Sequence, residues 1–163
     1  MLEQLMQLIS QHGQTAVVNN NEVPNEHNEA VMQEAGSSIF SGLQNAISSG
    51  GLSSVTSLFN SGNLSNVTSN PVVQNIIQQL TGNLSNKFNL SPAAAQNVSN
   101  SLVPNVLNNL ANKAIDPNDS SIDTQGILGS LTGGGNFQDM IGKFTQSGSG
   151  GGIMDSLSGF FGK

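Results

Sequence analysis

Two consecutive segments with helical spacing, which together span residues 70–114, limit the possible folds of this chain more than any other feature. Each segment opens with a small polar residue followed by a proline, first Asn70-Pro71 and then Ser91-Pro92. The Asn or Ser side chain can accept a hydrogen bond from an unpaired N–H group of the first turn, and proline fits that turn without strain. The pattern therefore predicts two successive helices.

Apolar residues recur every three or four positions in both segments, so that each predicted helix has one apolar face. Asn89 predicts the break between them, because Asn tolerates the left-handed conformation at a helix end. Pro104 lies inside the second helix, where it removes a backbone hydrogen bond and predicts a kink. The positions predicted to be buried are Val72, Val73, Ile76, Ile77, Leu80, Leu84 and Phe88 in the first helix and Ala95, Val98, Leu102, Val106, Leu107 and Leu110 in the second.

The chain before this pair also has helical spacing. One apolar face predicts an N-terminal helix that stops at Gly13, and the Asn-rich residues 14–23 are interpreted as a linker. A longer helix is predicted to begin near Pro24 and to end at Gly50, and a short helix over residues 52–59 and then a loop follow. The apolar positions are Leu2, Leu5, Met6 and Ile9 in the N-terminal helix and Val31, Ala35, Ile39, Leu43 and Ile47 in the longer one.

After the central pair the predicted helices become short. Residues 116–119 predict a turn, and Asp123 is a candidate cap for a short helix that ends before Gly133. Two amphipathic segments, Phe137–Phe144 and Ile153–Phe161, follow on Gly-rich connections and need a surface to pack on. The predicted organisation is an all-α fold of three parts, which are an N-terminal helix with its linker (1–23), a helical domain (24–132) and a tail with two short helices (133–163).

A five-residue sequence occurs twice, because Gly62–Asn66 recurs as Gly82–Asn86. Each copy comes before a proline that begins a predicted helix. The spacing is short for a repeating pair of helices, so the repeat does not indicate a solenoid. We interpret both copies as helix-start sequences.

Charge is scarce, and its scarcity excludes several classes of function. Only 9% of the residues are charged, compared with about 25% in an average soluble domain. Four Lys and Arg residues together and a net charge of −6 cannot form the basic patch that binding to nucleic acid or to anionic membranes requires. The absence of cysteine excludes disulfides and thiolate chemistry. The sequence begins with no standard signal peptide, so we expect a cytoplasmic protein, with export by another route as an alternative.

Candidate sites for chemistry are weak. His27 lies among glutamates, but a di-metal bundle needs a Glu three residues before the His, where Pro24 stands, so we interpret His27 as solvated. His12 is expected at a helix C-terminus, where its charged form is favourable. Residues 116–123 lack the Gly and Glu of a calcium loop and are interpreted as a polar turn. No serine has an evident base with an orienting partner. The sequence therefore predicts no catalytic residue, no cofactor and no metal ligand.

A further motif begins at the break between the two central helices and consists of Phe88-Asn89-Leu90-Ser91, Ala95, Leu102-Val103-Pro104 and Leu107. It resembles the YidB-like family of bacterial proteins of unknown function, whose mark is a Leu-Ser helix start, an Ala-containing helix and a Leu/Ile-Pro step. The resemblance covers residues 28–131. Asn89 stands where the family usually has Gly, and both residues permit the left-handed turn. The resemblance implies a multi-helical bundle whose buried helix is residues 92–114, and it implies no activity.

Three functional hypotheses remain. The first is a non-catalytic structural or interaction protein whose partner is itself, because low charge density removes repulsion between copies. Its peripheral helices, Leu2–Ile9, Phe137–Phe144 and Ile153–Phe161, can reach across to a neighbour or pack on their own subunit. The second is a binder of an apolar ligand or membrane surface through Phe160-Phe161. The third is an enzyme, for which the sequence offers no candidate residues. The first is preferred.

Overall fold

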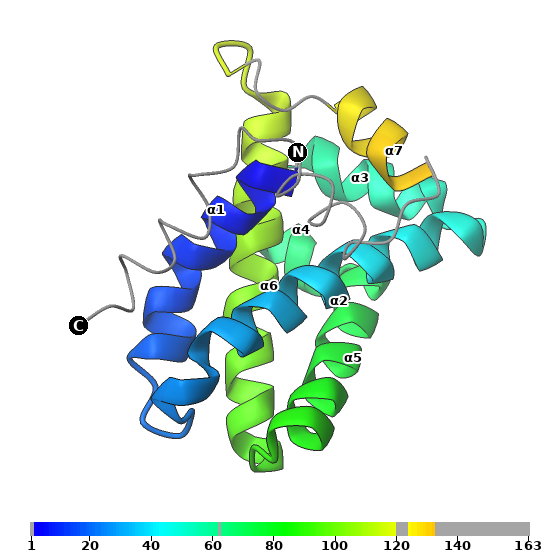
Figure 1. Ribbon diagram of the computed structural model, residues 1–163. Helices are drawn as coiled ribbons and strands as arrows, with labels where there is room; N and C mark the ends of the chain where they lie inside the picture. Colours follow the sequence, from blue (N-terminus) through cyan, green and yellow to red (C-terminus); the bar gives the residue numbers. More distant parts are fainter. Residues whose placement is uncertain (1, 62, 120–123, 133–163) are drawn as a thin grey trace, which may run out of the picture.

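Helix α6 (Pro92–Ile115) lies at the centre of the fold, with α1 (Leu2–Gly13) along one side and α5 (Pro71–Phe88) along another (Figure 1). The computed structural model describes residues 2–61, 63–119 and 124–132. Within these ranges the chain forms helices joined by short connections, so the predicted all-α class is confirmed. The other elements are the π-helical turn η1 (Gln14–Val18), the 3-10 turn η2 (Asn25–His27), α2 (Asn28–Ser48), α3 (Leu52–Ser61), α4 (Leu64–Ser69) and α7 (Thr124–Thr132).

The boundaries of α5 and α6 have the predicted chemistry. Asn70 Oδ1 accepts a hydrogen bond from the Val72 N–H at 2.9 Å, and Ser91 Oγ accepts one from the Ala94 N–H at 3.1 Å. Asn89, between the two helices, adopts the left-handed conformation with a φ of 54°. The caps pair N–H groups that a helix start leaves without an intrahelical partner, so neighbouring residues determine where these helices begin.

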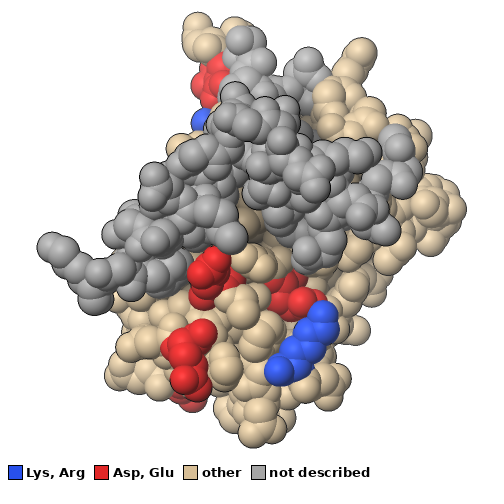
Figure 2. Space-filling view, in the orientation of Figure 1, with Lys and Arg blue, Asp and Glu red and all other residues tan. Residues whose placement is uncertain are grey.

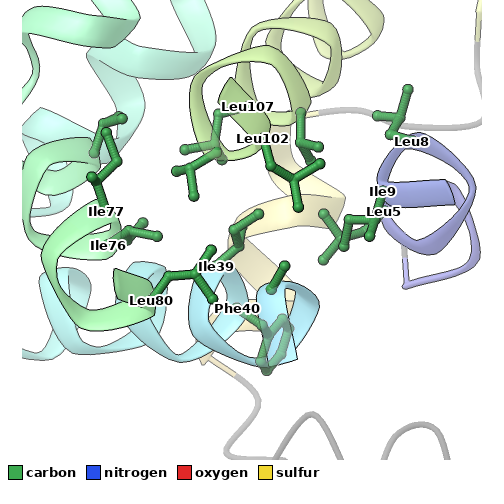
Figure 3. Close-up of a cluster of buried hydrophobic side chains, with 14 of the residues drawn as sticks. Leu5, Leu8, Ile9, Ile39, Phe40, Ile76, Ile77, Leu80, Leu102 and Leu107 are labelled. Carbon is green, nitrogen blue, oxygen red and sulfur yellow. The ribbon is translucent and has the colours of Figure 1, made fainter. Parts of the chain in front are cut away.

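The apolar faces of several helices meet around α6 and form one core (Figure 3). Leu102 and Leu107 of α6 lie between Ile9 of α1 and Ile76 of α5, and Ile39 of α2 lies on a third side. These five side chains have no exposed area. Burying a side chain of this size stabilises a fold by about 1.5–3 kcal/mol, so the core around α6 is the main source of stability.

Helix α6 is the buried helix of the bundle. Its buried residues run from Ala94 to Ala111, and they include all six positions predicted from the sequence. The helix is continuous through Pro104, which is itself buried. Contacts with α1, α3, α4 and α5 hold the helix along its length, although proline removes one of its backbone hydrogen bonds.

The N-terminal helix forms as predicted, but the residues that follow it are not the predicted linker. Helix α1 packs on α6 and α2, and η1 continues it with Ala16 and Val17 buried where a linker was expected. The α-helix ends at Gly13 as predicted, but Gly13 keeps the right-handed helical conformation, with φ −64° and ψ −29°, and the chain continues directly into the π-helical turn. A Cβ at Gly13 would collide with Met32 Sδ, so glycine is required where α1 and α2 approach each other. The apolar residues of this region belong to the same core as the central helices.

Between Gly50 and α5 the structure contains one helix more than predicted. Helix α2 ends at Ser48, just before the predicted stop at Gly50, which has a φ of 85°. The predicted loop after α3 contains α4, which Asn63 caps by accepting from the Ser65 N–H at 2.9 Å. The second copy of the repeat, by contrast, lies inside α5 and begins no helix. The helix-start interpretation is therefore correct for the first copy and wrong for the second.

The last described helix, α7, packs on α2. Ile127 and Leu131 are buried, as expected for the predicted short helix, and Gln44 Nε2 donates to the Leu131 carbonyl at 3.3 Å. The candidate cap Asp123 and the predicted segments in the tail, residues 133–163, lie outside the described residues.

Candidate functional site

The two histidines have different surroundings from those predicted. His12 Nε2 lies 2.9 Å from Asn109 Nδ2 on α6, and only an unprotonated ring nitrogen can accept a hydrogen bond from that amide. Burial lowers the pKa of His12 from its ordinary value of 6.5. The charged form is therefore disfavoured, although the position of His12 near a helix end had predicted the opposite. The ring of His27 packs against that of Phe88, with 5.8 Å between the ring centroids, so this side chain is not simply solvated.

The acidic residues of the N-terminal half do not converge on a common point. Within the described ranges, no group of three or more His, Asp or Glu residues is placed to hold a metal ion. Several carboxylates have separate hydrogen-bond partners, namely Gln33 for Glu29, Asn83 and Lys87 for Glu34, and Asn97 for Glu22.

The turn at residues 116–119 is a polar turn, as interpreted from the sequence. Asp116 Oδ1 accepts from the Asn118 N–H at 2.9 Å, which is the local bonding of an Asx turn. Lys113 Nζ pairs with Asp119 Oδ2 at 2.9 Å. Of the oxygen-bearing residues that gave the calcium-like pattern, which are Asp116, Asn118, Ser120 and Asp123, Asp116 is therefore engaged within the chain through Oδ1. Ser120 and Asp123 lie outside the described residues.

A polar junction joins the first half of α2 to the end of α5. Glu34 Oε1 accepts from Asn83 Nδ2 at 2.8 Å, and Glu34 Oε2 pairs with Lys87 Nζ at 2.8 Å. Asn83 Nδ2 also donates to Ser38 Oγ at 3.3 Å. The Glu34 side chain is only 13% exposed, so the two charge-assisted bonds hold its carboxylate between the helices. This junction aligns α2 with α5.

Next to the junction lies a long stretch without ionisable residues. A search for motifs does not find it, because it is defined by the residue types that it lacks. Between Glu34 and Lys87 no residue has an ionisable side chain. This span forms the rest of α2, all of α3 and α4, and most of α5, and these helices contact one another. In Figure 2 the visible charged side chains lie away from the end of α2 and from α3, which have only uncharged residues. We call the exposed residues of 45–86 the uncharged face.

A groove with a volume of about 400 Å³ opens on the uncharged face. Asn45 of α2 and Ser49, the residue that directly follows this helix, contribute to one wall, and α5 contributes Asn75 and Gln79 to another. Each pair is four residues apart, so its members lie one above the other on the same side. Smaller or less polar residues complete the lining, and these are Gly42, Ala46, Gly51, Ser54, Pro71 and Val72. The groove is therefore lined entirely by uncharged groups.

The tight contact of α2 with α5 borders this groove. A Cβ at Gly42 would collide with Ile76 Cγ1 on α5, so the two helices approach closely only because this position is glycine. Leu52, which directly follows the lining residue Gly51, is 47% exposed.

The carboxamides in the groove differ from their neighbours on the same helices. Asn70 donates to the Ser54 carbonyl at 3.0 Å, and Gln74 donates to the Thr68 carbonyl at 2.7 Å. The carboxamides of Asn45, Asn75 and Gln79, in contrast, make no hydrogen bond to any other described residue. Each can offer two N–H donors and a carbonyl acceptor to a binding partner.

Comparisons with known proteins supply no relative from which to transfer a role. No family model matches the chain, and neither curated proteins nor solved structures provide a match. Membership of the YidB-like family therefore stays a prediction from the motif at residues 88–107. Of the helices that the structure describes, none combines the length and apolar character needed to cross a membrane.

Proposed function

We propose that this protein is a non-catalytic interaction protein that associates with copies of itself. The observation that carries the proposal is the uncharged face. Copies with a net charge of −6 repel one another where their charged surfaces meet, and this repulsion is weakest where a surface has no ionisable groups. The uncharged face also has two of the most exposed large apolar side chains among the described residues, Leu52 at 47% and Leu64 at 44%.

The N-terminal helix is not the free arm in this proposal. Its residues Leu5 and Ile9 are buried on the same chain, so this part of the apolar face of α1 is already used within its own subunit. The predicted segments Phe137–Phe144 and Ile153–Phe161 remain candidates for a contribution to association. Their apolar positions and Gly-rich connections suit exchange between copies, as in arm-swapped oligomers.

Light scattering of the full-length protein across a concentration series tests self-association. We expect the mean mass to rise with concentration toward a multiple of the monomer mass of 16.8 kDa, since association follows mass action. Deletion of residues 133–163 measures the contribution of the tail. A full-length chain that keeps the monomer mass at every concentration overturns the proposal. The alternative of binding through Phe160-Phe161 then predicts co-sedimentation with neutral lipid vesicles.

A further inference from the structure

The walls of the groove have a chemistry that can bind itself. A carboxamide contains both donors and an acceptor, so two identical carboxamide surfaces can form hydrogen bonds with each other. Identical surfaces that carry charges of only one sign cannot do so, because like charges would face each other. Asn45, Asn75 and Gln79 are exposed and unbonded within the described part of the chain, so their pairing would break no existing hydrogen bond.

A second copy is also the partner that the charge distribution favours. A partner of opposite charge would be attracted to the acidic parts of the surface, around the start of α2 and the turn at 116–119, and not to a groove without charge. A copy of the same acidic chain can approach only where like charges do not meet. Leu52, which follows the lining residue Gly51 in sequence, is 47% exposed and would lose apolar exposed area if the contact reaches it.

We propose that the groove between α2, α3 and α5 binds the same groove of a second copy about a two-fold axis, with the walls Asn45–Ser49 and Asn75–Gln79 in the contact. This inference rests on the proposed self-association and names the surface that carries it. Two-fold pairing fits because it brings the same patch of both subunits together, and it is the commonest symmetry of soluble oligomers.

A pair of adjacent substitutions tests the surface. Gln79→Arg places a charge in the groove, whereas Gln78→Arg places the same charge on an exposed neighbour that does not line it. We expect Gln79→Arg to raise the dissociation constant about tenfold or more, because the interface would desolvate two unpaired charges. Gln78→Arg should leave the constant within about twofold of the wild-type value. Equal behaviour of the two variants overturns the proposal.

The opposite wall supplies an independent pair, in case Gln79→Arg perturbs folding. Asn45→Arg lies in the groove, and Ser48→Arg is an exposed control on the same helix. Circular dichroism and the thermal midpoint should match the wild-type protein for all four variants, since every substituted residue is exposed. Weaker association in Asn45→Arg alone supports the proposal, and unchanged association overturns it.

Cysteine cross-linking tests the two-fold symmetry. Because the chain has no native cysteine, an introduced cysteine is the only thiol that can react. With a short cross-linker that reacts with a thiol at each of its ends, Gln79→Cys should give a covalent dimer, because the two copies of this position lie on the same interface. Ile115→Cys, exposed at the far end of α6, should not. Cross-linking of Ile115→Cys alone overturns the face-to-face arrangement. A wild-type protein that is monomeric overturns self-association itself, whereas an oligomer unaffected by groove substitutions overturns only this surface.

Discussion

The sequence Asn-Leu-Ser-Asn occurs at two places in this molecule, and the two copies have different structures. At residues 63–66 it begins α4, where Asn63 caps the helix and Leu64 is 44% exposed. At residues 83–86 it lies inside α5, where Leu84 has no exposed area. The residues are identical, so the difference comes from what surrounds them.

The preceding residues explain most of this difference. The second copy follows an apolar series in α5, and Leu84 extends it by one turn from Leu80. A helix that has already formed adds each further residue at little cost, so Asn83 continues the helix instead of starting one. Its side chain then bonds to Glu34 across the helix pair, whereas Asn63 bonds to its own backbone. Helix-start chemistry is thus used only where a helix is not already in progress.

The largest expected effect separates the two leucines. Leu84→Ala should lower the free energy of unfolding by about 2–5 kcal/mol, because it leaves a cavity in the core. Leu64→Ala should lower it by only about 1 kcal/mol, because 44% of the side chain is exposed and its removal leaves no enclosed cavity. Urea denaturation of both variants measures the difference. Similar losses in the two variants would contradict the comparison.

The two asparagines should differ in the order of their Ala and Gly variants. At the cap, Asn63→Ala should cost about 1 kcal/mol and Asn63→Gly only a few tenths, since glycine is an acceptable cap and alanine is not. Inside α5, Asn83→Gly should be less stable than Asn83→Ala by about 1 kcal/mol, because glycine disfavours a helix interior. The same denaturation measurement applies, and the same order at both positions would remove the distinction between them.

A stabilising substitution sharpens the comparison from the other direction. Gly82 begins the second copy of the repeat. Apart from Gly82 itself, its two chain neighbours and the nearby backbone of α5, no atom lies within 4 Å of the point that a Cβ would occupy there. Gly82→Ala should therefore raise the free energy of unfolding by about 0.5–1 kcal/mol. Gly42→Ala is the matched control, because its Cβ would collide with Ile76 and should lower stability. A loss of stability in Gly82→Ala would show that residue 82 is not in an open helix interior.

The smallest expected effect concerns His12, whose surroundings also outweigh its position near a helix end. Burial holds its pKa in the folded state below the ordinary value of 6.5, so the unfolded chain binds the proton more readily. The contribution of neutral His12 to stability is fully present above pH 6.5 and is lost progressively as the pH falls below it. His12→Gln should reduce this pH dependence of the unfolding free energy, measured by urea denaturation. An unchanged pH profile would show that His12 does not cause it.

The parts of the fold that could be predicted from the sequence depend on adjacent residues. The caps Asn70 and Ser91 and the left-handed Asn89 act within a few positions of themselves, and the apolar faces of α5 and α6 follow from spacing alone. The close approach of Gly13 to Met32 was not predictable in this way, since only the packing of α1 on α2 brings the two residues together.

The candidate site was less accessible to sequence reasoning than the fold. The absence of ionisable residues between Glu34 and Lys87 is visible in the sequence, but nothing in the order of residues says that this span forms one face. The groove needs walls from α2 and α5. Whether the carboxamides of Asn75 and Gln79 have hydrogen-bond partners within the chain depends on how several helices pack. Such a site becomes apparent only after the helices are packed.

The polar junction and the Gly42–Ile76 contact together fix the register of α2 and α5. Glu34 and Gly42 are eight positions apart on α2, while Asn83 and Ile76 are seven apart on the antiparallel α5, so each contact fits only when the other is in place. Sliding α5 by one turn would separate Glu34 from Lys87 and would remove Ile76 from the space next to Gly42. The alignment of the groove walls is therefore set partly at the opposite end of the helix pair, by the only charged side chain between residues 35 and 112.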